Sequence, residues 1–163
     1  MLIIISGLPG TGKTTLAKLV ARYYRAVNIS SDAIRKKLFV KPEYTKQEKE
    51  VVYQEINRLT EEELHKGKNV VVDASFHTGE ERKIFKLAEK TATSVFVILC
   101  TVPEEEIRRR LDGRKKGLSD ANFDVYLKMK EEFEPITEKH LQIGMGTRKE
   151  IMKKINEFVS SSY

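Results

Sequence analysis

Short apolar runs alternate along this chain with segments in which apolar residues recur every three or four positions. The runs predict β-strands at Leu2–Ile5, Ala26–Ile29, Val70–Asp73, Val95–Cys100 and Leu141–Ile143. The periodic segments predict helices at Thr14–Tyr24, Asp32–Phe39, Thr45–Lys66 and Arg148–Val159. Strands that alternate with helices predict an α/β fold, with a parallel sheet covered on both faces. Ligands of such a sheet bind beyond the carboxyl ends of its strands.

Three pairs of residues have the spacing of a capping box, in which a threonine precedes a glutamate by three positions. The pairs are Thr45 with Glu48, Thr78 with Glu81, and Thr101 with Glu104. The first predicts the start of the long helix that ends near Lys66. The second pair predicts the start of a helix whose apolar residues are Ile84, Phe85, Leu87 and Ala88. The third pair predicts the start of another helix, with Pro103 in its first turn.

The first apolar run leads into a glycine-rich segment that precedes a helical pattern. This segment reads Gly7-Leu8-Pro9-Gly10-Thr11-Gly12-Lys13-Thr14-Thr15. It matches G-x-x-x-x-G-K-[ST], and its position between a strand and a helix is the context that this motif requires. Backbone amides at such a helix N-terminus suit a polyphosphate. The motif predicts that Lys13 reaches the β- and γ-phosphates and that the Thr14 hydroxyl binds Mg²⁺.

An acidic residue and a basic residue follow the second predicted strand. Asp32 and Arg35 are one helical turn apart and therefore share one face of the helix. In a phosphoryl-transfer site, Asp32 could accept the proton of an attacking hydroxyl, and Arg35 could hold an anionic part of the acceptor. The alternative is a helix cap with a surface ion pair between the two side chains.

The third predicted strand ends in a carboxylate. Asp73 follows three valines, and a carboxylate at the end of a buried strand is costly without a partner. In a protein with this loop, such a residue commonly orders Mg²⁺ or the Thr14 hydroxyl. The alternative is an aspartate that caps the following turn. His77, a few residues further on, is interpreted as a loop or capping residue.

A basic segment follows the fourth predicted strand. Six arginines and lysines lie within Arg108–Lys116, after the acidic Glu104–Glu106. The segment predicts an arginine-bearing lid that closes on the transferring phosphate and excludes water. A solvated helix and a groove for nucleic acid are the alternatives. Gly144-Met145-Gly146 follows the last strand and is expected to pass near the adenine base.

Composition limits the class of protein. The 163 residues predict one domain, 1–163, and 33% charged residues with 40% hydrophobic ones are typical of a globular chain. The formal charge of +6 attracts anions, which include both ATP and nucleic acid. No apolar run approaches membrane-spanning length, and Leu2–Ile5 is too short for a signal peptide, so we expect no membrane partner and a cytoplasmic location. Cys100, the single cysteine, is expected to be a buried thiol.

Together these motifs resemble the P-loop kinases related to the kinase domain of polynucleotide kinase and to the zeta toxins. The resemblance covers nearly the whole chain, and the motifs that carry it are Gly7–Thr15, Ser31-Asp32-x-x-Arg35, Val70–Phe76, Arg110-Leu111-x-x-Arg114 and Ser119-Asp120-Ala121. It implies a P-loop NTPase with a five-stranded parallel sheet in the order 2-3-1-4-5. Phe76 departs from the pattern, because these polynucleotide kinases often have asparagine there.

The resemblance also implies an activity and roles for particular residues. It implies an ATP- and Mg²⁺-dependent kinase that acts on a hydroxyl acceptor, with Asp32 as general base and Arg35 on the acceptor side. Arg110 and Arg114 match arginines of a lid at about residues 104–122, where Arg110 also contacts the nucleotide, and Asp73 matches the acidic residue of the third strand. The acceptor is a polynucleotide 5′-hydroxyl or a small metabolite such as a sugar acid, a nucleoside or an antibiotic. A nucleotide-dependent switch or nucleic-acid-binding module is the rival from another class.

Overall fold

The computed structural model describes residues 1–86, 93–113 and 121–161. The strands are β1 (Leu2–Ser6), β2 (Val27–Ser30), β3 (Val70–Asp73), β4 (Val95–Cys100) and β5 (His140–Ile143). The helices are α1 (Lys13–Tyr23), α2 (Ser31–Leu38), α3 (Lys46–His65), α5 (Glu104–Asp112), α6 (Phe123–Glu131) and α7 (Arg148–Ser160), with a 3-10 helix η1 (Glu81–Lys86). Within these residues, no helix combines the length and the apolar character that crossing a bilayer requires.

All five strands form one parallel sheet in the order β2-β3-β1-β4-β5. This order confirms the expected α/β fold. The register places Asp73 beside Ile5 of β1 and Ser30 of β2. The residues that follow these three strands therefore meet at one edge of the sheet.

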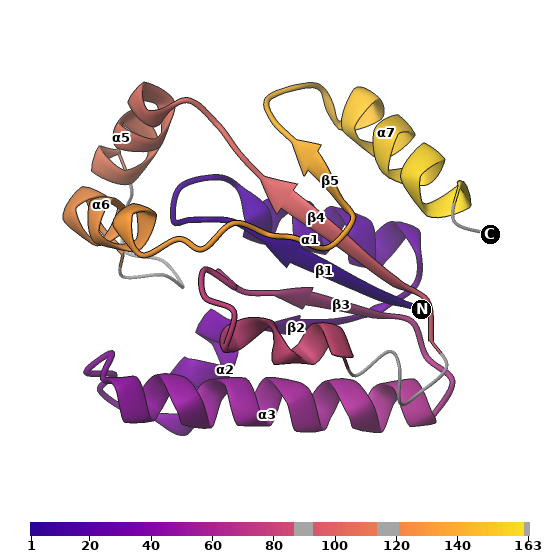
Figure 1. Cartoon of the computed structure of the whole chain (residues 1–163), viewed down its shortest axis with the longest axis horizontal. Helices are drawn as coiled ribbons and strands as arrows, with labels where there is room; N and C mark the ends of the chain where they lie inside the picture. Colours follow the sequence, from indigo (N-terminus) through magenta and orange to yellow (C-terminus); the bar gives the residue numbers. More distant parts are fainter. Residues whose placement is uncertain (87–92, 114–120, 162–163) are drawn as a thin grey trace.

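Alternating side chains of the strands form two apolar cores on the two faces of the sheet. On one face, Ile4 and Val72 pack with Val52 and Ile56 of α3. On the other face, Ile3 and Ile5 share a core with α1 and α7. Figure 1 shows these layers, with α5 and α6 together beyond the carboxyl ends of the strands.

A third apolar cluster explains a helix that the sequence pattern did not predict. Phe123 and Tyr126 of α6 pack against Ile107 and Leu111 of α5, and Leu8 contacts this cluster. Helix α6 is short, and its apolar face is completed only by residues of another element. This packing holds the α5–α6 pair against the loop that follows β1.

The predicted capping boxes have different outcomes. Thr45 accepts a hydrogen bond from the Glu48 amide, as expected. The third box is wrong: Pro103 occupies the N-cap of α5 without a side-chain bond, and the Thr101 hydroxyl accepts from Gln142 instead. A complete box that we did not predict, formed by Thr147 and Glu150, begins α7.

The second predicted box also does not form a regular cap. The Glu81 amide donates weakly to the Thr78 hydroxyl at 3.4 Å, but η1 is a 3-10 helix and not an α-helix. The Glu81 carboxylate turns inward to Tyr53 and His77, so it is not available to the backbone at residue 78. A tertiary contact has replaced the local cap.

Candidate active site

The loop between β1 and α1 has a tightly curled backbone. Gly10 and Gly12 have φ angles of 84° and 90°, which are left-handed values that favour glycine. The Thr11 hydroxyl donates to the Leu8 carbonyl at 2.8 Å and closes the turn. A Cβ atom at Gly10 would lie 2.9 Å from Ile107 Cγ2, because α5 packs directly on the loop. The predicted phosphate-binding loop therefore has the left-handed backbone conformation that glycine allows, and α5 packs against the loop.

We predict that Gly10→Ala destabilises the protein and weakens nucleotide binding. The left-handed backbone costs an L-residue about 1–2 kcal/mol, and the overlap with Ile107 adds about 1–3 kcal/mol. Gly67→Ala is the matched control, because Gly67 has φ 73° but no atom within 4 Å of the added carbon. Denaturant unfolding and calorimetry with nucleotide measure both effects. Equal losses in the two variants, with unchanged nucleotide affinity, would contradict the prediction.

Residues of the loop line two cavities. The larger cavity has a volume of about 680 Å³ and is lined by Gly12 and Thr15. The smaller cavity has a volume of about 370 Å³ and is lined by Pro9 and Lys13. Both volumes are within the range of small-molecule sites. The loop thus connects a site large enough for a nucleotide with a second, smaller site.

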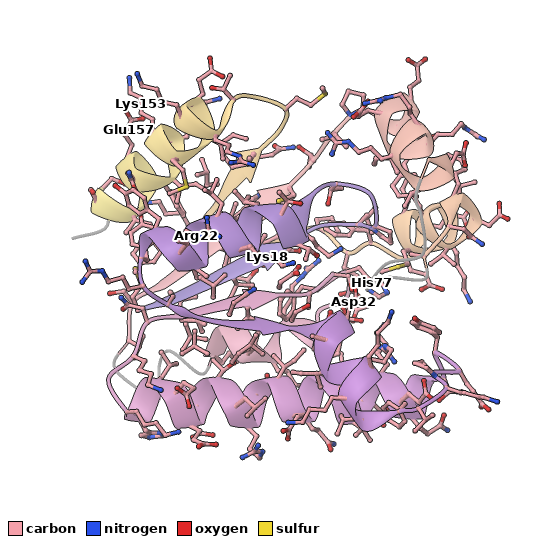
Figure 2. The ribbon with its side chains drawn as sticks, turned by 180° about the vertical axis from the view of Figure 1, so that it is seen from behind. Lys18, Arg22, Asp32, His77, Lys153 and Glu157 are labelled. Carbon is pink, nitrogen blue, oxygen red and sulfur yellow. The ribbon has the colours of Figure 1, made fainter. Side chains whose placement is uncertain are left out.

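The larger cavity has a basic wall and an apolar wall. Its apolar wall includes Met145, between the two glycines that we expected near an adenine base, and these glycines also line the cavity. Lys18, Arg22 and Arg148 supply positive charge, and none of the described residues that line the cavity is acidic. Figure 2 shows Lys18 and Arg22 on α1. Sequence reasoning missed these three residues, because charges on the solvent side of a helix have no distinguishing pattern.

Cys100 also lines the larger cavity and behaves as predicted. Its thiol is buried, and burial raises its pKa to about 12. A thiol with so high a pKa remains protonated near neutral pH and is a poor nucleophile. Cys100 is therefore a packing residue beside Gly7.

Asp73 is almost completely buried at the end of β3, beside the loop. Burial raises the pKa of its carboxyl group, while the charge of Lys13 and a hydrogen bond from Thr14 oppose this effect. One carboxylate oxygen, Oδ1, has no hydrogen-bond partner. An unpartnered buried oxygen is costly unless a donor or a cation satisfies it. The oxygen atoms of Asp73 and Thr14 therefore fit a Mg²⁺ ion chemically, and their role as metal ligands stays a prediction.

The smaller cavity contains the two residues predicted on the acceptor side. Asp32, in the first turn of α2, lines this cavity together with Lys13 and Arg35. Arg35 Nη1 lies 3.6 Å from Glu48 Oε2, so Arg35 pairs with α3 and not with Asp32. The N-cap residue of α2, Ser30, makes no side-chain capping bond. The alternative of a surface Asp32–Arg35 ion pair is therefore wrong, and both side chains face the cavity.

A buried polar cluster forms part of the wall of the smaller cavity. Glu81 accepts hydrogen bonds from the Tyr53 hydroxyl at 3.0 Å and from the His77 amide at 2.9 Å, and it forms an ion pair with Lys49. His77 Nδ1 lies 3.1 Å from the same carboxylate, and Lys49 Nζ lies 3.3 Å from His77 Nε2. His77 lies in the loop after β3, as we interpreted it, but it is 3% exposed and lines the smaller cavity together with Asp32. No local signal reveals this cluster, because its members come from α3 and from the segment after β3.

Glu81→Gln is expected to lower the free energy of unfolding by about 3 kcal/mol at pH 7. Burial disfavours the Glu81 carboxylate, but bonds from His77 and Lys49 outweigh it and lower the pKa from 4.5 to about 2. A carboxyl group with a lowered pKa stabilises the fold above pH 4.5 and loses that contribution as the pH falls toward 2. Denaturant unfolding over this pH range should show the difference between wild type and variant disappear in acid.

Glu80→Gln is the matched control for this prediction. The Glu80 side chain is 76% exposed and forms a surface ion pair with Lys83. Its replacement should change stability by less than about 0.5 kcal/mol at any pH. A loss in Glu81→Gln that does not depend on pH would show that the carboxylate charge is not the cause.

Arg110 of α5 contacts the loop directly. Its Nη1 donates to the Gly10 carbonyl at 3.2 Å, and its Nε bonds to Glu106. The neighbouring Arg109 also bonds to Glu106, but its side chain is 75% exposed. Arg110 is thus placed beside the candidate phosphate site. The second predicted lid arginine, Arg114, lies outside the described residues, as do Ser119 and Asp120.

A buried strand, a left-handed glycine loop, a lysine at the start of the next helix and a carboxylate on the neighbouring strand define a P-loop nucleotide-binding protein. Comparison with known proteins gives the family. Residues 2–136 match the family AAA_33, described as an AAA domain. The chain belongs to this family.

Individual relatives and solved structures extend this finding. An adenylate kinase of Petrotoga mobilis is 32% identical over 125 residues, which are 71% of this chain and 58% of that protein. An uncharacterized protein of Mycobacterium tuberculosis is 29% identical over 137 residues, and the match spans only 28% of its length. The structure of a sugar kinase from Janibacter has a TM-score of 0.73 at 16% identity and covers 98% of this chain and 94% of that chain. The overall fold is therefore that of P-loop kinases.

Proposed function

We propose that this protein is an ATP-dependent kinase that transfers the γ-phosphoryl group to a hydroxyl group of a small molecule. One observation carries the proposal: residues of the P-loop line both cavities, and Lys13 and Asp32 line the same smaller one. The nucleotide would occupy the larger cavity, with its γ-phosphate at Lys13. An acceptor in the smaller cavity would then place its hydroxyl between this phosphate and Asp32.

The proposed reaction is an in-line displacement at phosphorus. The acceptor oxygen forms a bond to the γ-phosphorus, the bond to the oxygen that bridges the β- and γ-phosphates breaks, and ADP leaves. Asp32 takes the proton of the acceptor hydroxyl. Lys13 and Arg110 stabilise the charge on the transferring group. Thr14 and Asp73 would hold Mg²⁺, which neutralises charge on the β- and γ-phosphate oxygens.

The size of the smaller cavity favours a metabolite over a polynucleotide. At about 370 Å³ it matches a molecule the size of a sugar or a nucleoside. It is lined by Tyr53 of α3, by Met129 of α6 and by Tyr44 from the segment between α2 and α3. A sugar kinase among the similar structures agrees with a hydroxyl acceptor of this size. Of the two acceptor classes that the sequence left open, we therefore favour the small molecule.

Transfer of radiolabelled γ-phosphate tests this function. The panel should contain sugars, sugar acids and nucleosides, with 5′-hydroxyl DNA and RNA and with AMP as competing acceptors. We expect a labelled small hydroxyl compound. Labelling of AMP alone would replace the hydroxyl acceptor with a phosphate. ATP turnover without any labelled acceptor would favour a nucleotide-dependent switch.

A further inference from the structure

Two cationic side chains on the α2 and α3 wall of the smaller cavity, Arg35 and Lys49, have N–H groups that make no hydrogen bond within the described residues. Lys49 lines this cavity, and about one third of its side chain is exposed. An ammonium group has three N–H donors. One of them points to His77 Nε2 at 3.3 Å, and the ammonium group forms an ion pair with Glu81, whose Oε1 makes no hydrogen bond. At least one N–H is therefore left for a ligand in the cavity.

Both ring nitrogens of His77 face groups of the protein, so His77 does not take the remaining N–H of Lys49. Because an ammonium group only donates, His77 Nε2 must accept from Lys49 and carry no proton. The ring proton is then on Nδ1, which lies 3.1 Å from Glu81 Oε2. Both ring nitrogens are thus used within the protein, and the histidine holds the lysine in place.

Arg35 is the second donor on this wall. Its Nη1 atom is buried and makes no hydrogen bond, although Glu48 Oε2 lies 3.6 Å away. The Glu48 carboxylate is occupied by the backbone amides of Glu43 and Tyr44, at 2.7 to 3.0 Å. Arg35 therefore has a charge partner but retains an unused N–H, and it lines the same cavity as Lys49.

The buried carboxylate next to this wall faces protein groups. Glu81 Oε2 accepts from the Tyr53 hydroxyl and the His77 amide, and the buried Oε1 makes no hydrogen bond but forms an ion pair with Lys49. A neutral hydroxyl of a ligand would need an acceptor for its own proton, whereas an oxyanion needs only donors. The remaining carboxylates of the cavity are Asp32, on the proposed reacting side, and Glu132, which is half-exposed and lies 3.7 Å from His77 Nε2.

We infer that the acceptor carries an oxyanion (a carboxylate, sulfate or phosphate) which Lys49 and Arg35 bind at the end of the cavity away from the phosphorylated hydroxyl. This inference rests on the proposed function and specifies its substrate class. Lys49 is then an acceptor-binding residue. Glu81 and His77 are positioning residues, because they act through Lys49.

Matched pairs of acceptors test the inference by kinetics. Gluconate against glucose isolates a carboxylate, glucose 6-phosphate against glucose isolates a phosphate, and adenosine 5′-phosphosulfate against adenosine isolates a phosphosulfate. For the pair that is phosphorylated, the anionic member should have a kcat/KM at least about tenfold higher. Lys49→Met should remove about 10- to 100-fold of this preference, the worth of one charged hydrogen bond, through KM and with kcat within about threefold. An equal loss for both members, or a preference for the neutral member, would overturn the inference.

Lys46→Met is the control variant, since it removes the same charge from the exposed first turn of α3, outside the cavity. Calorimetry keeps the test independent of phosphoryl transfer. With AMPPNP and Mg²⁺ filling the nucleotide site, sulfate, phosphate and acetate are titrated into wild type and both variants. We expect saturable binding that only Lys49→Met weakens, by about tenfold or more. Absence of such binding, or equal binding by all three proteins, overturns the inference, whereas binding without transfer to any acceptor rejects the kinase function alone.

A double-mutant cycle tests the positioning role of Glu81. Glu81→Gln should raise KM for the anionic acceptor in wild type and should have little further effect in the Lys49→Met background. A residue with a merely structural role would give the same change in both backgrounds. Additive effects would therefore remove Glu81 from the proposed site, because it would not act through Lys49.

Discussion

Arg110→Ala is expected to lower kcat for phosphoryl transfer by about 10³-fold or more, because an arginine that neutralises the transferring phosphoryl group contributes 10³–10⁵ in related reactions. The structure supports this role for Arg110 in particular. Its guanidinium donates to the Gly10 carbonyl, and its Nη1 would lie 3.4 Å from a Cβ atom at Gly12. The guanidinium is therefore within reach of a phosphate bound to the loop.

Arg109→Ala provides a closely matched control. Both arginines follow Glu106 on α5 and both bond to its carboxylate, but only Arg110 reaches the loop. Single-turnover phosphoryl transfer should change less than about threefold in Arg109→Ala, which removes an exposed charge. Similar losses in both variants would indicate that the net charge or stability of α5 matters, and would reject Arg110 as the catalytic arginine.

Asp32→Asn should lower kcat by about 10²- to 10⁴-fold while nucleotide affinity stays close to wild type, because a general base typically contributes this much to the rate. Asparagine keeps the shape of the side chain but cannot take the proton of the acceptor hydroxyl. Asp32 lines the smaller cavity and not the larger one, in which we propose that the nucleotide binds, so ATP binding should be unaffected. Transfer assays with saturating ATP and calorimetry with AMPPNP separate the two effects.

The control for this second prediction is Asp124→Asn on the exposed first turn of α6, outside both cavities. It removes one carboxylate without touching the site. If Asp32→Asn retains kcat within about tenfold of wild type, the assignment of Asp32 as general base is wrong. The lysine and arginine groups would then account for catalysis by charge stabilisation alone.

Local sequence signals were sufficient for the elements that depend on local structure. The P-loop follows from glycines and a lysine at fixed spacing, and its left-handed φ angles need no distant partner. Apolar runs predicted all five strands to within about one residue, since strands buried on both faces are continuously apolar. Asp32 and Arg35 follow β2 and Asp73 ends β3, and the register of a parallel sheet brings the ends of its strands together.

Features that depend on non-local packing were missed or misassigned. Helix α6 lacked a clear pattern because Ile107 and Leu111 of α5 complete its apolar contacts. Glu81 has the spacing of a capping residue, but its carboxylate forms an ion pair with Lys49 and accepts a hydrogen bond from Tyr53, both on α3. Thr101 likewise bonds to Gln142 of β5 and not within its own helix.

By itself, the sequence determined that this chain has a P-loop, alternating strands and helices, and acidic residues at the ends of two strands. These features depend on backbone conformation and on residues that are close along the chain. Only the tertiary structure decided that Lys49 and His77, both in contact with Glu81, line the smaller cavity and that Arg110, not Arg109, contacts the loop. The physical reason is that these contacts join residues that are far apart in the sequence. They form only when α3 and α5 have packed, so the spacing of neighbouring residues does not predict them.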